Sequence, residues 1–126
     1  MSASRQATII LKNTTNAILS RTAYSLDHGI WSADAVPPEI IGYGTLAGPS
    51  TGTWANESQG FMTGAQGTAS YAMLDGTLIT TTWDDPYIGS DESTVSISGP
   101  SAEKYKINKT EHDGNNYTVT FTLMAA

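Results

Sequence analysis

Apolar and polar residues alternate with a period of two along several stretches of the chain. The clearest stretch is 117–123, in which Tyr117, Val119, Phe121 and Leu123 alternate with threonines. Such alternation predicts a half-buried antiparallel strand with one face toward the core and one hydroxyl-rich face outside. The same reasoning from apolar and β-branched runs predicts strands at 7–13, 20–26, 39–46, 50–57, 67–74, 77–83 and 104–108.

Turn residues divide these strands. Asp75-Gly76 between 67–74 and 77–83 predicts a hairpin closed by a two-residue primed turn, which needs positive φ angles. A second hairpin is predicted between 104–108 and 117–123, across residues 111–116. Residues 30–38 contain two prolines and predict a loop. Since turn signals return every ten or so residues without helical periodicity, the sequence predicts an all-β fold, an antiparallel two-sheet β-sandwich.

Length and charge narrow the class of protein. The 126 residues fit one domain, 1–126, and we expect 1–5 and 125–126 to be loose termini. Twelve acidic residues against six Lys and Arg give a net charge of -6, which argues against nucleic acid and anionic lipid as partners. A membrane would be bound through neutral or zwitterionic headgroups or by apolar insertion. No signal peptide is recognised, so we expect a soluble protein, cytoplasmic or released by another route.

The sequence offers little chemistry for catalysis. It has no cysteine, and its two histidines, His28 and His112, lie in turn contexts. No nucleophile elbow, phosphate-binding loop or zinc motif occurs, so we expect no enzyme activity and no cofactor. The carboxylates of Asp84, Asp85, Asp91 and Glu92 are weak candidates for a Ca²⁺ site. Their spacing does not match an EF-hand, and acidic turns are usually solvated, so no metal is predicted.

Aromatic residues near strand ends are better candidates for a binding site. Trp31 lies in the proline-rich loop, and Trp83 and Tyr87 bracket Asp84-Asp85-Pro86. Phe61 lies in a short segment between Gly60 and Gly64. Rings with an apolar body and a polar tip suit membrane interfaces and equally suit stacking on sugars. The sequence leaves open that each tryptophan belongs to the core instead.

Three stretches together resemble the aegerolysins, which are small acidic proteins. The most specific runs from Trp83 to Ser90, Trp-Asp-Asp-Pro-Tyr-Ile-Gly-Ser, and is followed by Ser98-Gly99. The second is the Gly- and Thr-rich segment 57–68, and the third is the opening strand 8–13 with Trp31 beyond it. The match covers most of the chain in order.

The resemblance implies a β-sandwich that binds membrane lipids, often sphingolipids or sterol-rich surfaces. It also implies pore formation, as in a cytolytic or hemolytic defence system, when a larger perforin-like protein partner is present. Carried over by motif, Trp31, Trp83 and Tyr87 would face lipid, and Asp84 would orient the turn or meet a headgroup amine. Phe61 completes the predicted ligand-binding set.

Two other functions remain open on the sequence alone. A lectin would use the same Trp, Asp and Asn side chains to stack on and hydrogen-bond a glycan. A self-assembling structural protein would pair the hydroxyl face of Thr118, Thr120 and Thr122 with another copy. The sequence does not determine the oligomeric state.

Overall fold

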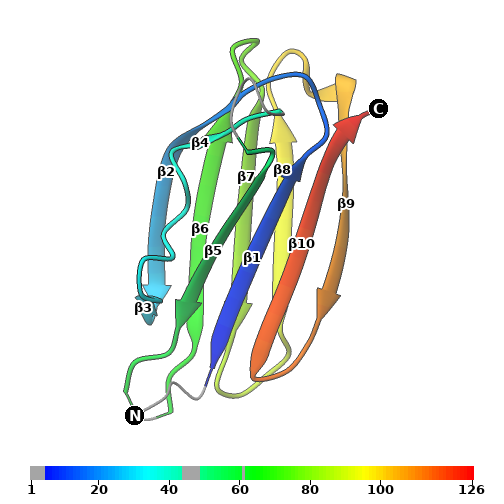
Figure 1. Cartoon of the computed structure of the whole chain (residues 1–126). Coiled ribbons are helices and arrows are strands. Elements are labelled where there is room, and N and C mark those ends of the chain that lie inside the picture. The colour runs from blue at the N-terminus through cyan, green and yellow to red at the C-terminus, as the bar shows by residue number, and fades with distance from the viewer. Residues whose placement is uncertain (1–4, 44–48, 61) are drawn as a thin grey trace.

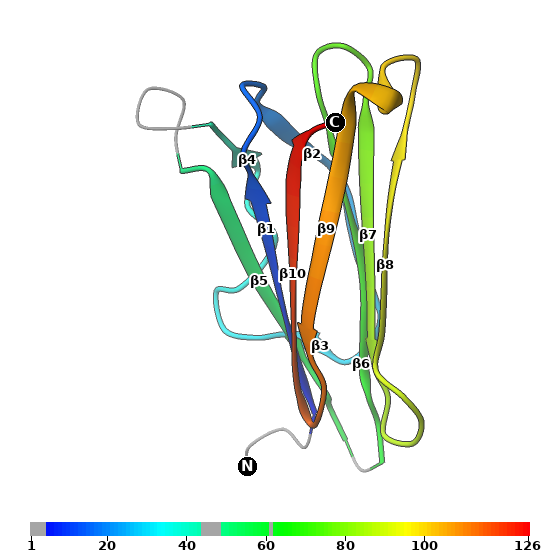
Figure 2. The same ribbon diagram turned by 90° about the vertical axis from the view of Figure 1, so that its right-hand side faces the viewer.

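The chain folds into two five-stranded sheets packed face to face, as the computed structural model shows (Figure 1; Figure 2). The structure describes residues 5–43, 49–60 and 62–126. The strand order is β3-β5-β1-β10-β9 in the first sheet and β4-β2-β6-β7-β8 in the second. The elements are β1 (Gln6–Asn13), β2 (Leu19–His28), β3 (Ile30–Trp31), β4 (Ile40–Ile41), β5 (Thr51–Glu57), β6 (Ala65–Ala72), β7 (Leu78–Asp85), β8 (Glu92–Ser98), the 3₁₀ turn η1 (Ala102–Lys104), β9 (Tyr105–His112) and β10 (Asn116–Ala125). The predicted β-sandwich is confirmed.

One strand pair departs from the predicted antiparallel pattern. β1 and β10 lie side by side and run parallel, with Ile9 opposite Val119. The other neighbouring pairs among the described strands are antiparallel. A parallel pair needs a long connection, and here almost the whole domain lies between the two strands. The first sheet is therefore mixed.

Several predicted strands are shorter or longer than expected. In the described part of the predicted strand 39–46, Ile40–Ile41 form β4, and residues 44–46 lie outside the described ranges. The predicted loop 30–38 contains the two-residue β3. β8, Glu92–Ser98, was not predicted because its serines and threonines obscure the alternation of Val95 and Ile97. Within the described ranges, no helix is long and apolar enough to cross a membrane.

The hairpin of β6 and β7 is confirmed, but its turn differs from the prediction. Gly76 N donates to Met73 O at 3.1 Å, and Met73 N donates to Thr77 O at 2.9 Å. Gly76 has φ of +89°, whereas Asp75 does not adopt a positive φ. Three residues, 74–76, therefore connect the strands, a common alternative to the two-residue primed turn. Asp75 Oδ1 instead accepts a hydrogen bond from Thr77 N at 2.9 Å.

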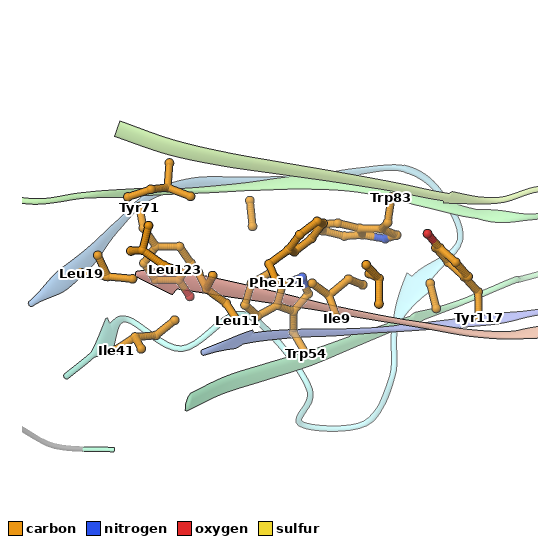
Figure 3. Close-up of a cluster of buried hydrophobic side chains, with 14 of the residues drawn as sticks. Ile9, Leu11, Leu19, Ile41, Trp54, Tyr71, Trp83, Tyr117, Phe121 and Leu123 are labelled. Carbon is orange, nitrogen blue, oxygen red and sulfur yellow. The ribbon is translucent and has the colours of Figure 1, made fainter. Parts of the chain in front are cut away.

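The core lies between the sheets and is built from alternate residues of each strand (Figure 3). Tyr117, Val119, Phe121 and Leu123 are fully buried, as their spacing predicted. Tyr71, Ile79 and Trp83 of the second sheet are buried opposite them, and Trp54 is buried beside them on β5 of the same sheet. The intervening residues of β10, Thr118, Thr120 and Thr122, are half-buried on the opposite face.

The connections between strands gather at two ends of the sandwich. We call the N-terminal end the one at which the β2–β3, β5–β6, β7–β8 and β9–β10 connections meet (Figure 1). The β6–β7 turn lies at the opposite end, a full strand length along β7 (Figure 1). Ala125 lies in β10 opposite Tyr105, and Ala126 N donates to Lys104 O at 2.9 Å. These C-terminal residues are thus paired, although the sequence suggested a loose terminus.

Candidate functional site

Five aromatic rings form a row that runs from the surface into the core. The ring centroids of neighbours are 5.8 Å apart for Tyr24 and Trp31, 6.0 Å for Trp31 and Trp83, 6.2 Å for Trp83 and Trp54, and 6.0 Å for Trp54 and Tyr71. Tyr24 is exposed, Trp31 is half-buried, and the other three are buried. Trp31 therefore closes the open side of the sandwich and keeps part of its ring accessible.

Trp83 lies in the core, not on the surface where the resemblance would place it. Its side chain is 1% exposed, and its Nε1 donates to Asn56 Oδ1 at 3.0 Å. The reason is the two-residue period of β7, which turns Trp83 inward together with Ile79. Gly67 on β6 leaves room for the indole, since a Cβ there would lie 2.7 Å from Trp83 Cζ2.

Asn56 organises this region, and the sequence reasoning missed it. The residue is fully buried on β5, and its Nδ2 donates to His28 O at 3.2 Å and to Ile30 O at 2.9 Å. It thereby fastens the end of β2 and the start of β3, the strand that carries Trp31, to β5. The sequence did hint at a special role for Asn56, because this amide follows Trp54 and Ala55 within a predicted strand.

Tyr87 sits on the β7–β8 connection beside Arg5. Arg5 Nε donates to Pro86 O at 3.3 Å, and Arg5 Nη2 donates to Tyr87 O at 3.0 Å. The guanidinium carbon lies 5.0 Å from the centre of the Tyr87 ring, within cation–π range. Arg5 was expected in a loose terminus, but it holds the base of this connection. Tyr87 is half-buried as a result.

Three large apolar side chains are exposed at the N-terminal end, two on connections and one at the start of β3. Ile88 on the β7–β8 connection is 81% exposed, Met62 on the β5–β6 connection is 53% exposed, and Ile30, the first residue of β3, is 41% exposed. Met62 has a positive φ of +60°. Phe61, which was predicted to bind ligand, lies outside the described residues. The exposed apolar residues Ile88 and Met62 were not predicted as site residues.

The four acidic residues considered as metal ligands do not converge. Asp84 and Asp85 are adjacent on β7, so their side chains leave opposite faces of the sheet. Asp84 faces outward with Glu92 opposite it in register, and burial together with the Glu92 charge raises the pKa of Asp84. Asp85 faces inward and is 1% exposed. Among the described residues, no group of three or more His, Cys, Asp or Glu is placed to hold a metal ion.

A pocket of about 270 Å³ opens at the N-terminal end between the β7–β8 and β9–β10 connections. We call it the loop-end pocket. Its charged lining comes from Arg5, Asp85, Asp91 and Asp113. Burial and the neighbouring Asp91 carboxyl raise the pKa of Asp85 to about 8. The pocket therefore brings one guanidinium together with three acidic side chains, of which Asp85 is protonated at neutral pH.

A second pocket of about 240 Å³ lies on the outer face of the second sheet. Acidic, amide and hydroxyl side chains from four strands line it, namely Asp27, Gln66, Thr68, Thr82, Asp84, Glu92 and Thr94. Thr82 and Thr94 are joined by a hydrogen bond between their hydroxyls. The lining offers oxygen acceptors and hydroxyl donors, the groups that recognise polyhydroxylated ligands.

No protein-family model matches the sequence, and no curated protein matches it. Solved structures, in contrast, are similar along nearly the whole chain. The lipid-binding protein Nakanori superposes with a TM-score of 0.78 at 12% identity, over 97% of this chain and 72% of Nakanori.

Two further structures have lower TM-scores. RahU, whose crystal structure contains a TRIS molecule, superposes with a TM-score of 0.74 at 14% identity, over 99% of this chain and 98% of RahU. The Xerocomus chrysenteron lectin XCL superposes with a TM-score of 0.55 at 11% identity, over 95% of this chain and 99% of the lectin. The chain therefore has the β-sandwich fold that a lipid-binding protein and a lectin also have.

Proposed function

We propose that this chain is a non-enzymatic protein that binds the surface of lipid membranes with the N-terminal end of its sandwich. The observation that carries the proposal is the exposure of three large apolar side chains at one end of the sandwich: Ile30 at the start of β3, Met62 on the β5–β6 connection and Ile88 on the β7–β8 connection. Apolar side chains on a rigid scaffold enter a headgroup layer without an ordering cost for the rest of the domain. The half-buried rings of Trp31 and Tyr87 suit the polar boundary of that layer.

The negative charge of the protein determines which lipid headgroups it can approach. The loop-end pocket holds Asp91 and Asp113 against Arg5, and the whole chain carries a net charge of -6. Anionic lipids would be repelled, whereas neutral and zwitterionic headgroups would not. The proposal is therefore a surface rich in zwitterionic sphingolipid and sterol, as the resemblance to aegerolysins implies. The fold shared with a lipid-binding protein supports it.

The decisive experiment is sedimentation with vesicles. We expect binding to sphingomyelin–cholesterol or ceramide phosphoethanolamine–cholesterol vesicles and weaker binding to phosphatidylserine vesicles. Ile88→Ser removes an apolar side chain worth about 1.5–3 kcal/mol when fully buried, so it should weaken binding roughly tenfold to a hundredfold. Leu74→Ser is the matched control, because Leu74 is fully exposed on the turn at the opposite end of β7. Equal effects of the two substitutions, or no binding to any vesicle, would contradict the proposal.

Membrane binding at this end also accommodates a cytolytic role with a larger perforin-like partner. In that role the chain supplies lipid recognition and the partner supplies the pore. Lysis of sphingomyelin–cholesterol vesicles should then require both proteins and should fall with Ile88→Ser. Lysis by the chain alone would contradict this division of labour.

A glycan-binding function is the second candidate, and the pocket on the outer face of the second sheet favours it. Its oxygen-rich lining of carboxylate, amide and hydroxyl groups is suited to sugar hydroxyls. The fold shared with a lectin adds support. A glycan array separates the two candidates, with Gln66→Ala as the test variant and Ile88→Ser as the control. Glycan binding lost with Gln66→Ala but kept with Ile88→Ser would establish this second function.

A further inference from the structure

The pocket on the outer face of the second sheet is elongated across the strands. Its lining residues come from β2, β6, β7 and β8, which are successive neighbours in that sheet. Since neighbouring strands lie about 4.8 Å apart, the lining extends over about 14 Å from β2 to β8. A volume of about 240 Å³ over this span makes the hollow long and narrow. We call it the cross-strand trough.

Strand register divides most of the lining into two rows that cross the sheet. Each row places one residue of β6, one of β7 and one of β8 directly opposite one another, and the two rows are Gln66, Asp84 and Glu92, and Thr68, Thr82 and Thr94. The first row presents carboxylate and amide groups, and the second presents hydroxyls. The trough therefore has a carboxylate and amide wall on one side and a hydroxyl wall on the other.

A change of register on β2 extends the carboxylate and amide wall to a fourth strand. Leu26 is opposite Gly67, whereas His28 is opposite Gln66, so Asp27 is an extra residue on β2. An extra residue of this kind, a β-bulge, re-aims side chains and occurs often beside functional sites. Asp27 is exposed and lines the trough. The bulge thus adds a carboxylate at the β2 end of the wall.

The trough is acidic and has no cationic side chain to balance it. Neither Lys nor Arg is among the described residues that line it. Burial raises the pKa of Asp84, and the negative charge of Glu92 raises it further, whereas His28 lowers it. A ligand with carboxylate or sulfate groups would bring charge of the same sign into this place, which is unfavourable. The lining therefore disfavours acidic glycans.

We propose that the cross-strand trough binds a linear, uncharged oligosaccharide that lies across β2, β6, β7 and β8 between the two walls. This binding mode rests on the glycan-binding function proposed above and specifies its ligand class. Carboxylate oxygens accept hydrogen bonds from sugar hydroxyls, and the threonine hydroxyls and the Gln66 amide can donate to them. Successive rings meet the same two walls on successive strands, so each added ring gains contacts until the chain has crossed the trough.

Calorimetric titration with linear oligomers of glucose, mannose and N-acetylglucosamine, from one ring to about five, tests this binding mode. A pyranose ring is about as long as the spacing between strands, so the trough accommodates about three rings. For at least one sugar we expect affinity to rise about tenfold or more from one ring to three, because hydrogen bonds are added, and to change less than about twofold beyond four rings. Trigalacturonic acid, which is linear and acidic, should bind at least about tenfold more weakly than the neutral trimer.

Thr82→Val tests the hydroxyl wall at its centre, and Thr80→Val is the matched control. Both threonines are half-buried on the outer face of β7, and each shares a hydrogen bond with a hydroxyl of a neighbouring strand, but only Thr82 lines the trough. Thr82→Val should weaken trimer binding about threefold to tenfold, whereas Thr80→Val should change it less than about twofold. If Thr82→Val fails to fold, Asp27→Ala at an exposed position serves instead, with the same expected loss of trimer affinity.

The amide signals of Asp27 and Thr94 report on the two ends of the trough by NMR. Both signals should shift when the trimer binds, because the trimer spans from β2 to β8. Affinity that does not depend on chain length, equal effects of Thr82→Val and Thr80→Val, or trimer shifts confined to one end would overturn this binding mode.

Failure of the binding mode and failure of glycan binding itself are distinguishable. If a glycan array shows binding only to branched or acidic glycans, the linear binding mode is wrong, but the glycan-binding function stands. If the chain binds no glycan on the array or in the titrations, both are contradicted.

Discussion

Replacing Asn56 with alanine tests how the aromatic row is held in place. The side chain makes three hydrogen bonds from a fully buried position, one accepted from Trp83 and two donated to the carbonyls of His28 and Ile30. Alanine removes all three at once and leaves each partner group without a replacement from the protein.

The cost can be worked from the burial of those partners. A buried polar group left without a partner costs about 1–3 kcal/mol. The Trp83 indole N–H is buried and pays this cost in full, whereas the carbonyls of His28 and Ile30 are only partly buried and regain some hydration. Since the three losses are not additive, we expect Asn56→Ala to lower the free energy of unfolding by about 3 kcal/mol.

Urea unfolding followed by tryptophan fluorescence measures this value. Asn108→Ala on the exposed face of β9 is the control, with an expected change below about 0.5 kcal/mol. The native emission of Asn56→Ala should also shift to longer wavelength, because β3, which carries Trp31, loses its hydrogen bond from Asn56. A loss of less than about 1 kcal/mol for Asn56→Ala would refute the view that this amide organises the site.

Three further predictions concern packing, the hydrogen bonds between strands, and pH. Gly67→Ala should cost about 1–3 kcal/mol by urea unfolding, because its Cβ would lie 2.7 Å from both Ser25 O and Trp83 Cζ2. Tyr117→Phe should lower stability by about 1–2 kcal/mol, seen as a lower melting temperature, because its buried hydroxyl bonds to Ser93 Oγ at 2.7 Å. Burial raises the folded-state pKa of Asp85 above the unfolded value, so its stabilising contribution is complete below about pH 4 and is lost as pH rises to about 8. Melting temperatures at pH 5 and pH 8 should therefore show Asp85→Asn gaining stability relative to the wild type as pH rises, and a constant difference would contradict the shift.

The alternation of residues determined the fold class and much of the core. Tyr117, Val119, Phe121 and Leu123 were assigned to the buried face from spacing alone, and the structure buries all four. The hairpin at Asp75-Gly76 was predicted because tight turns need residues that tolerate positive φ angles, and such residues can be recognised by their type in the sequence. The three-residue geometry of this turn was not predicted, because it depends on the hydrogen bonds that Met73 makes with Gly76 and Thr77.

Only the tertiary structure decided which residues form the candidate site. A period of two divides a strand into two faces but does not say which face meets the other sheet when both carry large or polar groups. Trp83 was therefore expected outside and lies inside, while Asp85, on the same face of β7, is buried. The parallel pairing of β1 with β10 and the hydrogen bond from Gly114 N to Asp91 across the loop-end pocket join segments far apart in the chain. Such contacts depend on how the sheets pack, which no local pattern encodes.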